Sequence, residues 1–212
     1  MVDAHYLTTT TRNTTMPNWC SNDFSVYGKT ELVKKFIDDG FVKEDNQWKL
    51  SSYLPLPKEL ENTTSPCERN NGLIQKYGAD NWYDWQLKNW GCKWDCTYDG
   101  EIGITPQESG NSSADFYFQS PWSQPDLWFH HITKQYPELT FTMYYSEPGM
   151  DFCGAMHGED GNVEHEQGEH EYMDEDGGVY HWDSDIEAYI DEDGNEAENQ
   201  DDIDARNPFQ YS

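Results

Sequence analysis

The charge of this chain is divided so unevenly that it restricts where a folded core can form. Residues 157–212 hold 20 acidic residues and one arginine, a net charge of −19. The preceding 156 residues hold 21 acids and 12 bases, so they contribute −9 to the total of −28. Like charges at such density repel one another and leave little apolar surface to bury. We therefore expect the core before residue 157, where most of the aromatic residues lie.

Two hydrophobic periods alternate along this body. Alternation of apolar and polar residues predicts strands at residues 18–27 and 92–98. An apolar run predicts a strand at 114–119 and strong β-propensity predicts one at 139–146, with weaker continuations at 101–105 and 150–156. Helical spacing predicts helices at residues 31–38 and 126–135, and two short ones at 73–77 and 82–89. The order strand, helix, strand, strand, helix, strand is that of a ferredoxin-like βαββαβ domain. The predicted fold class is therefore α+β, with an antiparallel four-stranded sheet, two helices on one face, insertions, and an acidic C-terminal extension.

The composition divides the chain into four predicted segments. Residues 1–15 are rich in threonine without periodicity and are expected to be a flexible extension. Residues 16–158 form the ferredoxin-like domain. Residues 159–190 are expected to be an acidic hairpin with a short helix, because Gly177 and Gly178 can turn the chain. Residues 191–212 are expected to be a disordered acidic tail, in which Phe209 and Tyr211 form a terminal hook.

Five motifs occur in order along the body: MPNWCSN from Met16, LPLP from Leu54, NWGCKWD from Asn89, SPWSQP from Ser120 and YSEPGMDFCG from Tyr145. Together they resemble the YubB-type ferredoxin-like family, found in small accessory proteins of conjugative plasmids and tailed phages. The resemblance covers residues 16–154 and implies the fold and an origin on a mobile element. It implies no established activity. Cys92 departs from the small residue or threonine expected at that position.

Polar and aromatic residues of these motifs lie near strand ends, where they would suit a polar ligand or a peptide in one cleft. The candidate binding residues are Asn18, Trp19, Asn22, Asn89, Trp90, Lys93, Trp94, Asp95, Trp122 and Glu147. The competing interpretation is structural: tryptophans fill the core, asparagines cap turns, and Lys93 pairs with Asp95 or Glu147.

Metal binding and known catalytic motifs receive little support. Cys92 and Cys96 would lie about 13 Å apart on a strand, too far to hold one zinc ion. The glycines of the tail lack the acidic first position of a calcium loop, and His165 and His170 among carboxylates favour only loose cation binding. No nucleophile, phosphate-loop or dinucleotide motif occurs, so we expect no catalytic residue, metal or cofactor.

Two hypotheses of function follow. The first is an acidic accessory protein of a phage or plasmid that binds a host protein, in host takeover or counter-defence, with the tail imitating nucleic acid to a basic partner. The alternative is a module for a small ligand or metal, or an uncharacterised enzyme, that uses the tryptophan- and asparagine-containing cleft. Direct nucleic-acid binding is disfavoured by 13 bases against 41 acids. Five cysteines, no apolar membrane span and no signal peptide favour the host cytoplasm.

Overall fold

The structure is a computed structural model that describes residues 18–183 and 185–210. The expected extension at residues 1–15 and the second residue of the terminal hook, Tyr211, lie outside the described residues. The main sheet is antiparallel and has the strand order β5-β6-β1-β7-β8-β9. Its strands are β1 (Trp19–Lys29), β5 (Ile104–Pro106), β6 (Asn111–Pro121), β7 (Thr140–Glu147), β8 (Phe152–Glu159) and β9 (Asn162–Gly168).

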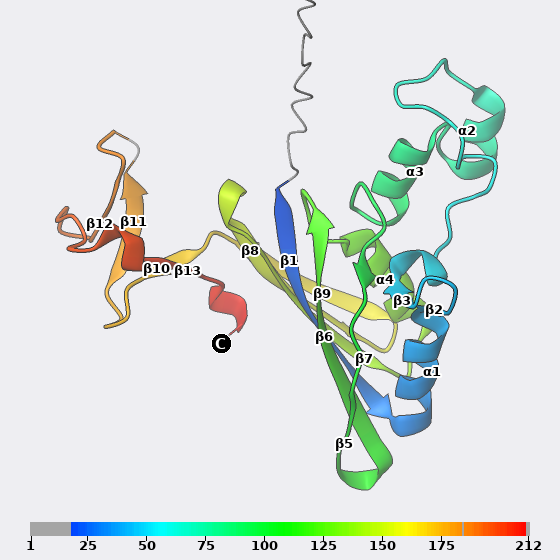
Figure 1. Ribbon diagram of the computed structural model, residues 1–212, viewed down its shortest axis with the longest axis horizontal. Helices are drawn as coiled ribbons and strands as arrows, with labels where there is room; N and C mark the ends of the chain where they lie inside the picture. The colour runs from blue at the N-terminus through cyan, green and yellow to red at the C-terminus, as the bar shows by residue number, and fades with distance from the viewer. Residues whose placement is uncertain (1–17, 184, 211–212) are drawn as a thin grey trace, which may run out of the picture.

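Helices α1 (Thr30–Gly40) and α4 (Asp126–Gln135) lie on the same side of this sheet, together with α2 (Asn71–Tyr77) and α3 (Trp82–Asn89) (Figure 1). A three-stranded sheet of β2 (Phe41–Val42), β3 (Gln47–Lys49) and β4 (Thr97–Tyr98) adjoins α1. The ferredoxin-like α+β class is confirmed, and the sheet is larger than the four strands predicted. The helices at 31–38 and 126–135 and the strands at 18–27, 114–119 and 139–146 are also confirmed, apart from small differences at their ends.

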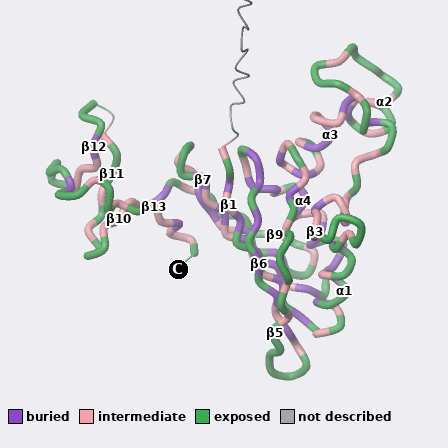
Figure 2. The backbone as a smooth tube through the Cα atoms, in the orientation of Figure 1, coloured by how far each residue is buried: buried purple, intermediate pink, exposed green. Residues whose placement is uncertain are grey.

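The core lies between the sheet and the two long helices. Alternate residues of β1 are buried, and Phe24 at its centre is 2% exposed. The ring of Phe24 lies 5.2–6.5 Å, centroid to centroid, from seven aromatic rings: those of Phe36, Trp48, Phe116, Phe118, Trp128, Phe129 and Phe141. These rings come from both helices and three strands, so one aromatic cluster joins the two layers. Buried positions concentrate in this part of the molecule (Figure 2).

The prediction of a strand at residues 92–98 is wrong for most of its length. Only Thr97–Tyr98 is a strand, and it pairs with β3 rather than with the main sheet. Residues 91–94 form bends, and Cys92 and Cys96 both turn inward, with their sulfur atoms 3.8 Å apart instead of the expected 13 Å. Two buried cysteines four residues apart produced the apparent alternation without an extended backbone.

The chain after residue 158 is more ordered than the sequence predicted. The expected domain limit at 158 falls within β8, and β9 pairs with β8 from Asn162 to Gly168. Beyond it, β10 (Glu171–Met173), β11 (Val179–Asp183), β12 (Ala188–Ile190) and β13 (Asp204–Arg206) form a second antiparallel sheet in the order β12-β11-β10-β13. A strand therefore ends the 183–190 segment where a short helix was expected, and residues 191–210 contain short elements rather than only coil.

This second sheet lies on the side of the main sheet opposite to the helices (Figure 1). We call residues 171–206 the acidic lobe. The chain then returns to the main sheet through the short helix η5 (Pro208–Gln210), which contacts β8. Asn207 is 6% exposed, and its side-chain amide donates to the carbonyls of Tyr145 and Gly154 at 3.0 and 2.9 Å. The C-terminal segment is thus fixed to the open face of the sheet.

Replacing Phe24 by alanine should lower the free energy of unfolding by about 3–5 kcal/mol, because the change removes a buried ring and leaves a cavity among the surrounding aromatics. Urea unfolding followed by tryptophan fluorescence measures the loss. Leu127→Ala, on the exposed face of α4 (39% exposed), is the control and should change the free energy by less than about 1 kcal/mol. A loss for Phe24→Ala as small as that of the control would contradict this account of the core.

Candidate functional site

The polar cluster that stands out in the structure lies where β7 ends and the chain turns into β8. The side-chain carboxylate of Glu147 accepts a hydrogen bond from the backbone amide of Gly149 at 3.2 Å, and Pro148 begins the short helix η3 (Pro148–Met150). Asp151 follows with a φ of 51°, a left-handed conformation that aspartate tolerates better than most residues. This turn brings Asp151 back beside Ser146, which precedes it by five residues.

The third member of the cluster arrives from the far end of the next hairpin. Asp160 and Gly161 have φ values of 51° and 77°, as a tight hairpin turn requires, so β9 runs back antiparallel along β8. Gly168 pairs with Cys153, which in turn pairs with Ser146. His170, two residues beyond Gly168, is thereby placed over the end of β7.

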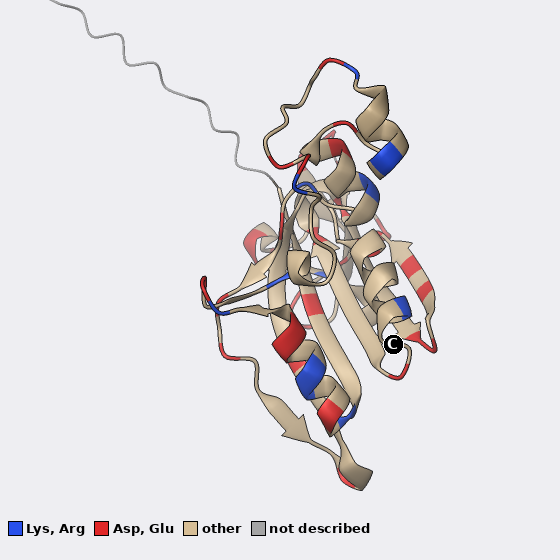
Figure 3. Cartoon of the chain, turned by 90° about the vertical axis from the view of Figure 1, so that its right-hand side faces the viewer, with Lys and Arg blue, Asp and Glu red and all other residues tan. Residues whose placement is uncertain are grey.

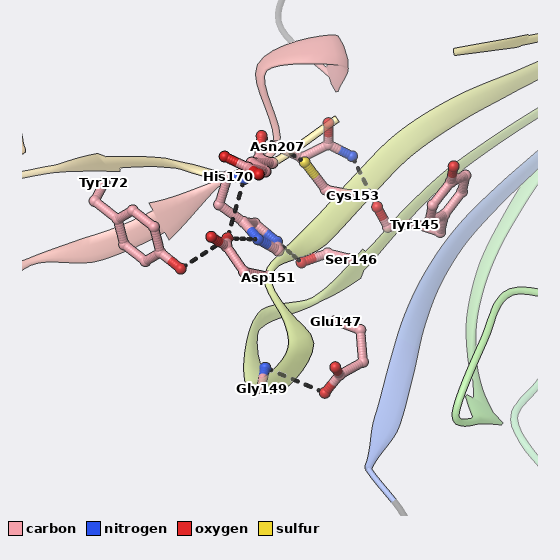
Figure 4. Close-up of polar contacts among 10 residues, drawn as sticks. Tyr145, Ser146, Glu147, Gly149, Asp151, Cys153, His170, Tyr172 and Asn207 are labelled. Carbon is pink, nitrogen blue, oxygen red and sulfur yellow. Dashed lines mark hydrogen bonds and ion pairs between the residues drawn. The ribbon is translucent and has the colours of Figure 1, made fainter. Parts of the chain in front are cut away.

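His170 joins the other residues in one chain of hydrogen bonds (Figure 4). Its Nε2 lies 2.7 Å from Ser146 Oγ, and its Nδ1 lies 3.1 Å from Asp151 Oδ1. Because a carboxylate oxygen only accepts, Nδ1 carries a proton, and in the neutral imidazole Nε2 accepts from the Ser146 hydroxyl. The His170 side chain is 0% exposed, whereas the Asp151 side chain is 44% exposed. The chain of bonds therefore runs from solvent through a buried imidazole to a hydroxyl.

Asp151 is held by more than the imidazole. Its Oδ1 also accepts hydrogen bonds from the Tyr172 hydroxyl at 2.8 Å and from the His170 backbone amide at 3.2 Å. Partial burial opposes ionisation, but the hydrogen bonds from Tyr172 and His170 outweigh it and lower the pKa of Asp151 below its ordinary value of 3.8. The carboxylate is therefore ionised at neutral pH and tethers the first strand of the acidic lobe.

The neighbouring pair Tyr145 and Gly154 shows why this end of the sheet has a glycine. The Tyr145 hydroxyl lies 2.7 Å from His165 Nε2 on β9, so the ring crosses β8 above Gly154. A Cβ at position 154 would lie 2.3 Å from that hydroxyl and 2.2 Å from the Glu166 carbonyl oxygen. Only glycine leaves room for the ring.

Five of the ten predicted binding residues lie where β1 begins and β6 and β7 end: Asn18, Trp19, Asn22, Trp122 and Glu147. The Asn18 carbonyl accepts from the Trp122 amide at 2.9 Å. Trp19 and Trp122 are 42% and 43% exposed. Asn22 is fully buried and donates to the Phe118 carbonyl and the Ser120 hydroxyl, so it fixes β1 to β6. Glu147 is 3% exposed, and its Oε2 has no hydrogen-bond partner among the described residues.

The other five lie at the end of α3 and in the segment that follows it: Asn89, Trp90, Lys93, Trp94 and Asp95. Trp90 is buried and donates to the Leu54 carbonyl at 2.9 Å, and Asn89 donates to the Trp85 carbonyl at 2.8 Å. Lys93 lies over the rings of Tyr83 and Trp94 and forms no ion pair with the residues that the structure describes, so the expected pairing with Asp95 or Glu147 is wrong.

Asp95 accepts from the Ser51 amide at 3.1 Å, and burial raises its pKa despite that bond. The partners of Asp95, Trp90 and Asn89 are those of a folded scaffold, as the structural interpretation of these residues expects.

The cysteines give no metal centre among the residues described. No group of three or more histidine, cysteine or acidic side chains has metal-binding geometry there. Burial, reinforced by Cys92, raises the pKa of Cys96, and burial raises the pKa of Cys20 to about 12, so these thiols stay protonated at neutral pH.

Sequence reasoning missed Ser146, Asp151, His170 and Tyr172 as a group. Ser146 and Asp151 lie inside the last of the five motifs, and that is the one signal the sequence offered. His170 was interpreted only as a loose cation ligand in an acidic segment. Its contact with Ser146 depends on the length and register of the β8–β9 hairpin.

The fold and this geometry define an α+β protein with a ferredoxin-like domain. Residues 93–190 match the family model described as "Ferredoxin-like domain in Api92-like protein". The uncharacterized protein YubB of Escherichia coli (strain K12) is 29% identical over 94 residues, which are 44% of this chain and 61% of that relative. The matched segment is therefore similar to the YubB-type ferredoxin-like proteins that the five motifs resemble. The chain spans less than two thirds of that relative's length.

The comparison with solved structures found a crystal structure of a protein, api92, from Yersinia pseudotuberculosis. It is 10% identical, with a TM-score of 0.43, and the alignment covers 73% of this chain and 98% of that one. The family match begins later and ends later than the 16–154 segment that carries the motifs, and it extends into β12. No helix among the described residues is long and apolar enough to cross a membrane.

Replacing Asp151 by asparagine should loosen the acidic lobe at neutral pH, because the charged acceptor for His170 and Tyr172 becomes a neutral amide oxygen. A hydrogen bond to a charged group exceeds a neutral one by about 1 kcal/mol at such a partly exposed site, so exchange of the amides of β10 should accelerate roughly 5-fold. Hydrogen exchange followed by mass spectrometry measures the effect, with the amides of β1 and β6 as internal references. Glu175→Gln, an exposed change, is the control.

The same experiment carries a pH test. A carboxylate whose folded pKa is lowered stabilises the fold above its unfolded pKa, and that contribution disappears as the pH falls through the folded value. The difference between wild type and Asp151→Asn should therefore be constant from pH 7 to about 5 and shrink below about 4. A difference that persists undiminished at pH 2–3 would show that the Asp151 charge does not hold the lobe.

Proposed function

We propose that this protein is an acidic accessory protein of a phage or plasmid, and that its acidic lobe binds a basic surface of a host protein. The observation that carries the proposal is the absence of internal compensation for the lobe's charge. Residues 171–206 hold fifteen acids and one arginine. None of those acids takes part in the four ion pairs found among the described residues. Because these charges are not paired within the described part of the chain, their negative electric field extends into the solvent, where it would attract a basic partner.

The lobe's own turns hold part of this charge in place. The sequence Asp-Glu-Asp-Gly occurs twice, at residues 174–177 and 191–194. In each copy the first aspartate accepts two backbone amides: Asp174 from Asp176 and Gly178, and Asp191 from Asp193 and Asn195. The Gly178 amide and the Tyr180 hydroxyl lower the pKa of Asp174, and the side chain and backbone amide of Asn195 lower the pKa of Asp191, so both carboxylates are ionised at neutral pH. The acids next to each first aspartate are exposed.

Both turns face one hollow. It has a volume of about 560 Å³, and Asp174, Asp176, Asp191, Glu196, Glu198 and Asp202 are among its lining residues. A lysine or arginine side chain of a partner would enter such a hollow favourably, because several fixed carboxylates act on it together.

The basic residues of the chain itself lie elsewhere. All ten lysines precede residue 135. On the helix-covered side of the molecule, Lys and Arg alternate with Asp and Glu (Figure 3). Charges of both signs therefore offset one another on that side, whereas the lobe has one sign. This contrast supports the lobe rather than the helical side as the electrostatic contact.

We further propose that the partner is a nucleic-acid-binding protein, because sites for nucleic acid are built from Lys and Arg. The protein would then occupy such a site in place of DNA or RNA, in host takeover or counter-defence and in the host cytoplasm. The mobile-element origin rests on the resemblance of the five motifs, and the partner class rests on charge complementarity.

The lobe charge should control partner capture. We expect the quadruple change Glu175→Gln, Glu192→Gln, Glu196→Gln and Glu198→Gln to weaken capture of the host partner at least tenfold, because four of the lobe's exposed charges are lost without loss of a turn hydrogen bond. Affinity capture from host cells, followed by titration of the recovered protein at 50 and 200 mM salt, measures the effect.

The matched control removes the same number of charges from the body: Glu31, Glu44, Glu61 and Glu138, all exposed, are each changed to glutamine. This variant should bind like wild type. Equal losses in both variants would refute a specific role of the lobe. Partner binding that is insensitive to salt and to competing double-stranded DNA would refute the imitation of nucleic acid.

A further inference from the structure

We propose that Ser146 is a nucleophile, activated by His170 and positioned through Asp151, that accepts an acyl group from a neutral or cationic carboxylic ester. The inference is independent of the proposed binding function, because it concerns the end of the main sheet and not the charge of the lobe. It rests on three features: the order of the hydrogen bonds, the fixed position of each group, and the burial of the imidazole.

The order of the hydrogen bonds is that required for general-base activation. Ser146 Oγ donates to His170 Nε2 at 2.7 Å, and His170 Nδ1 donates to Asp151 Oδ1 at 3.1 Å. With its proton fixed on Nδ1, the imidazole offers its lone pair to the hydroxyl. If the imidazole carried its proton on Nε2 instead of Nδ1, it could not take a proton from the Ser146 hydroxyl. In the neutral imidazole, this polarity is set by the carboxylate, which requires the proton on Nδ1.

Each group is held by an element that leaves it little freedom. Ser146 lies on β7, between β1 and β8, and pairs with Ser21 on one side and Cys153 on the other. Asp151 Oδ1 accepts two further hydrogen bonds, from the Tyr172 hydroxyl and the His170 amide. Such preorganisation allows a proton to move without rearrangement of the site.

Burial distinguishes this site from a surface hydrogen bond. The His170 side chain is 0% exposed, so water does not compete for its nitrogen atoms. Ser146 itself is half-buried, so its side chain is not sealed off from solvent. Phe209 packs against Gly168, on the face of the sheet that carries Ser146.

The chemistry is balanced without a metal or a redox partner. Ser146 Oγ bonds to the ester carbonyl carbon while its proton passes to His170 Nε2, and the alcohol leaves with that proton as the carbon–oxygen bond breaks. Water then attacks the acylated serine, again giving a proton to Nε2, and the acid is released with the serine restored. The acidic surroundings, with Glu169 and Glu171 flanking His170 in sequence, disfavour an anionic ester.

A neutral fluorophosphonate tests the nucleophile directly, because it phosphonylates an activated serine hydroxyl and releases fluoride. The full-length protein should gain the mass of one phosphonyl group, and peptide mapping should place it on Ser146. Ser146→Ala should abolish labelling. Ser21→Ala, which removes the hydroxyl next to Ser146 in the sheet, is the matched control and should be labelled at the wild-type rate.

Activation is tested by rate. His170→Gln and Asp151→Asn should slow labelling at least about 100-fold, as loss of a general base or of its orientation does. A purely structural role of Asp151 would leave the labelling rate of a folded Asp151→Asn variant at the wild-type value. Hydrolysis of p-nitrophenyl acetate by wild type above the Ser146→Ala background is a second readout.

The proposal is overturned if wild type is labelled no faster than Ser146→Ala, or if the label is found on another residue. These two measurements use only wild type, Ser146→Ala and Ser21→Ala, so they remain decisive if a His170 or Asp151 variant does not fold.

Discussion

The aromatic cluster around Phe24 is the constraint on which the rest of the structure depends. It occupies the space between β1 and the two long helices, where Phe24 and Val26 of β1 are almost fully buried. A core of this kind has no room for unpaired charge, because an isolated ion cannot be transferred from water at acceptable cost. Most acids of the chain therefore lie outside this core, on the outer surfaces of the helices, in loops and in the acidic lobe (Figure 3).

The elements that the sequence predicted well are those that contribute a whole row of side chains to this cluster. In β1 and β7 every second residue is buried, and α4 buries Trp128, Phe129 and Ile132 on one face, so each has a clear period. The pattern at residues 92–98 misled because two inward-facing cysteines on a bent backbone produce the same alternation as a strand. β9 was not recognised as part of the sheet, because no residue of this edge strand is fully buried. A strand without a buried face has no hydrophobic period to detect.

Most of the candidate site could not be predicted from the sequence, and the reason differs from that for β9. Ser146 and Asp151 are close in sequence, and the Glu147–Met150 turn that joins them has recognisable turn residues. His170 is 24 residues from Ser146, and its position depends on two successive strands being in the correct register. A shift of one residue in β9 would turn its side chains to the opposite face. For the predicted tryptophan- and asparagine-containing cleft, the sequence identified the residues but not the directions of their side chains. Residue type and proximity to a strand end do not show where a side chain points. Trp90 points into the core, and Asn22 joins two strands.

The acidic lobe shows how a segment with fifteen acids can still form a sheet. Asp174 and Asp191 accept backbone amides within their own turns, so part of the negative charge also supplies hydrogen bonds that the turns need. The remaining acids repel one another and weaken the compact state. Attachment to the main sheet opposes this repulsion, through Tyr172 and His170 at the start of the lobe and Asn207 after its end. A cationic partner would reduce the repulsion as it binds, so binding and ordering of the lobe are thermodynamically linked. The carboxylate of Asp151, which accepts the hydrogen bonds from Tyr172 and His170, anchors the lobe and also orients His170 toward Ser146. Any change that loosens the lobe therefore also changes the environment of the Ser146 hydroxyl.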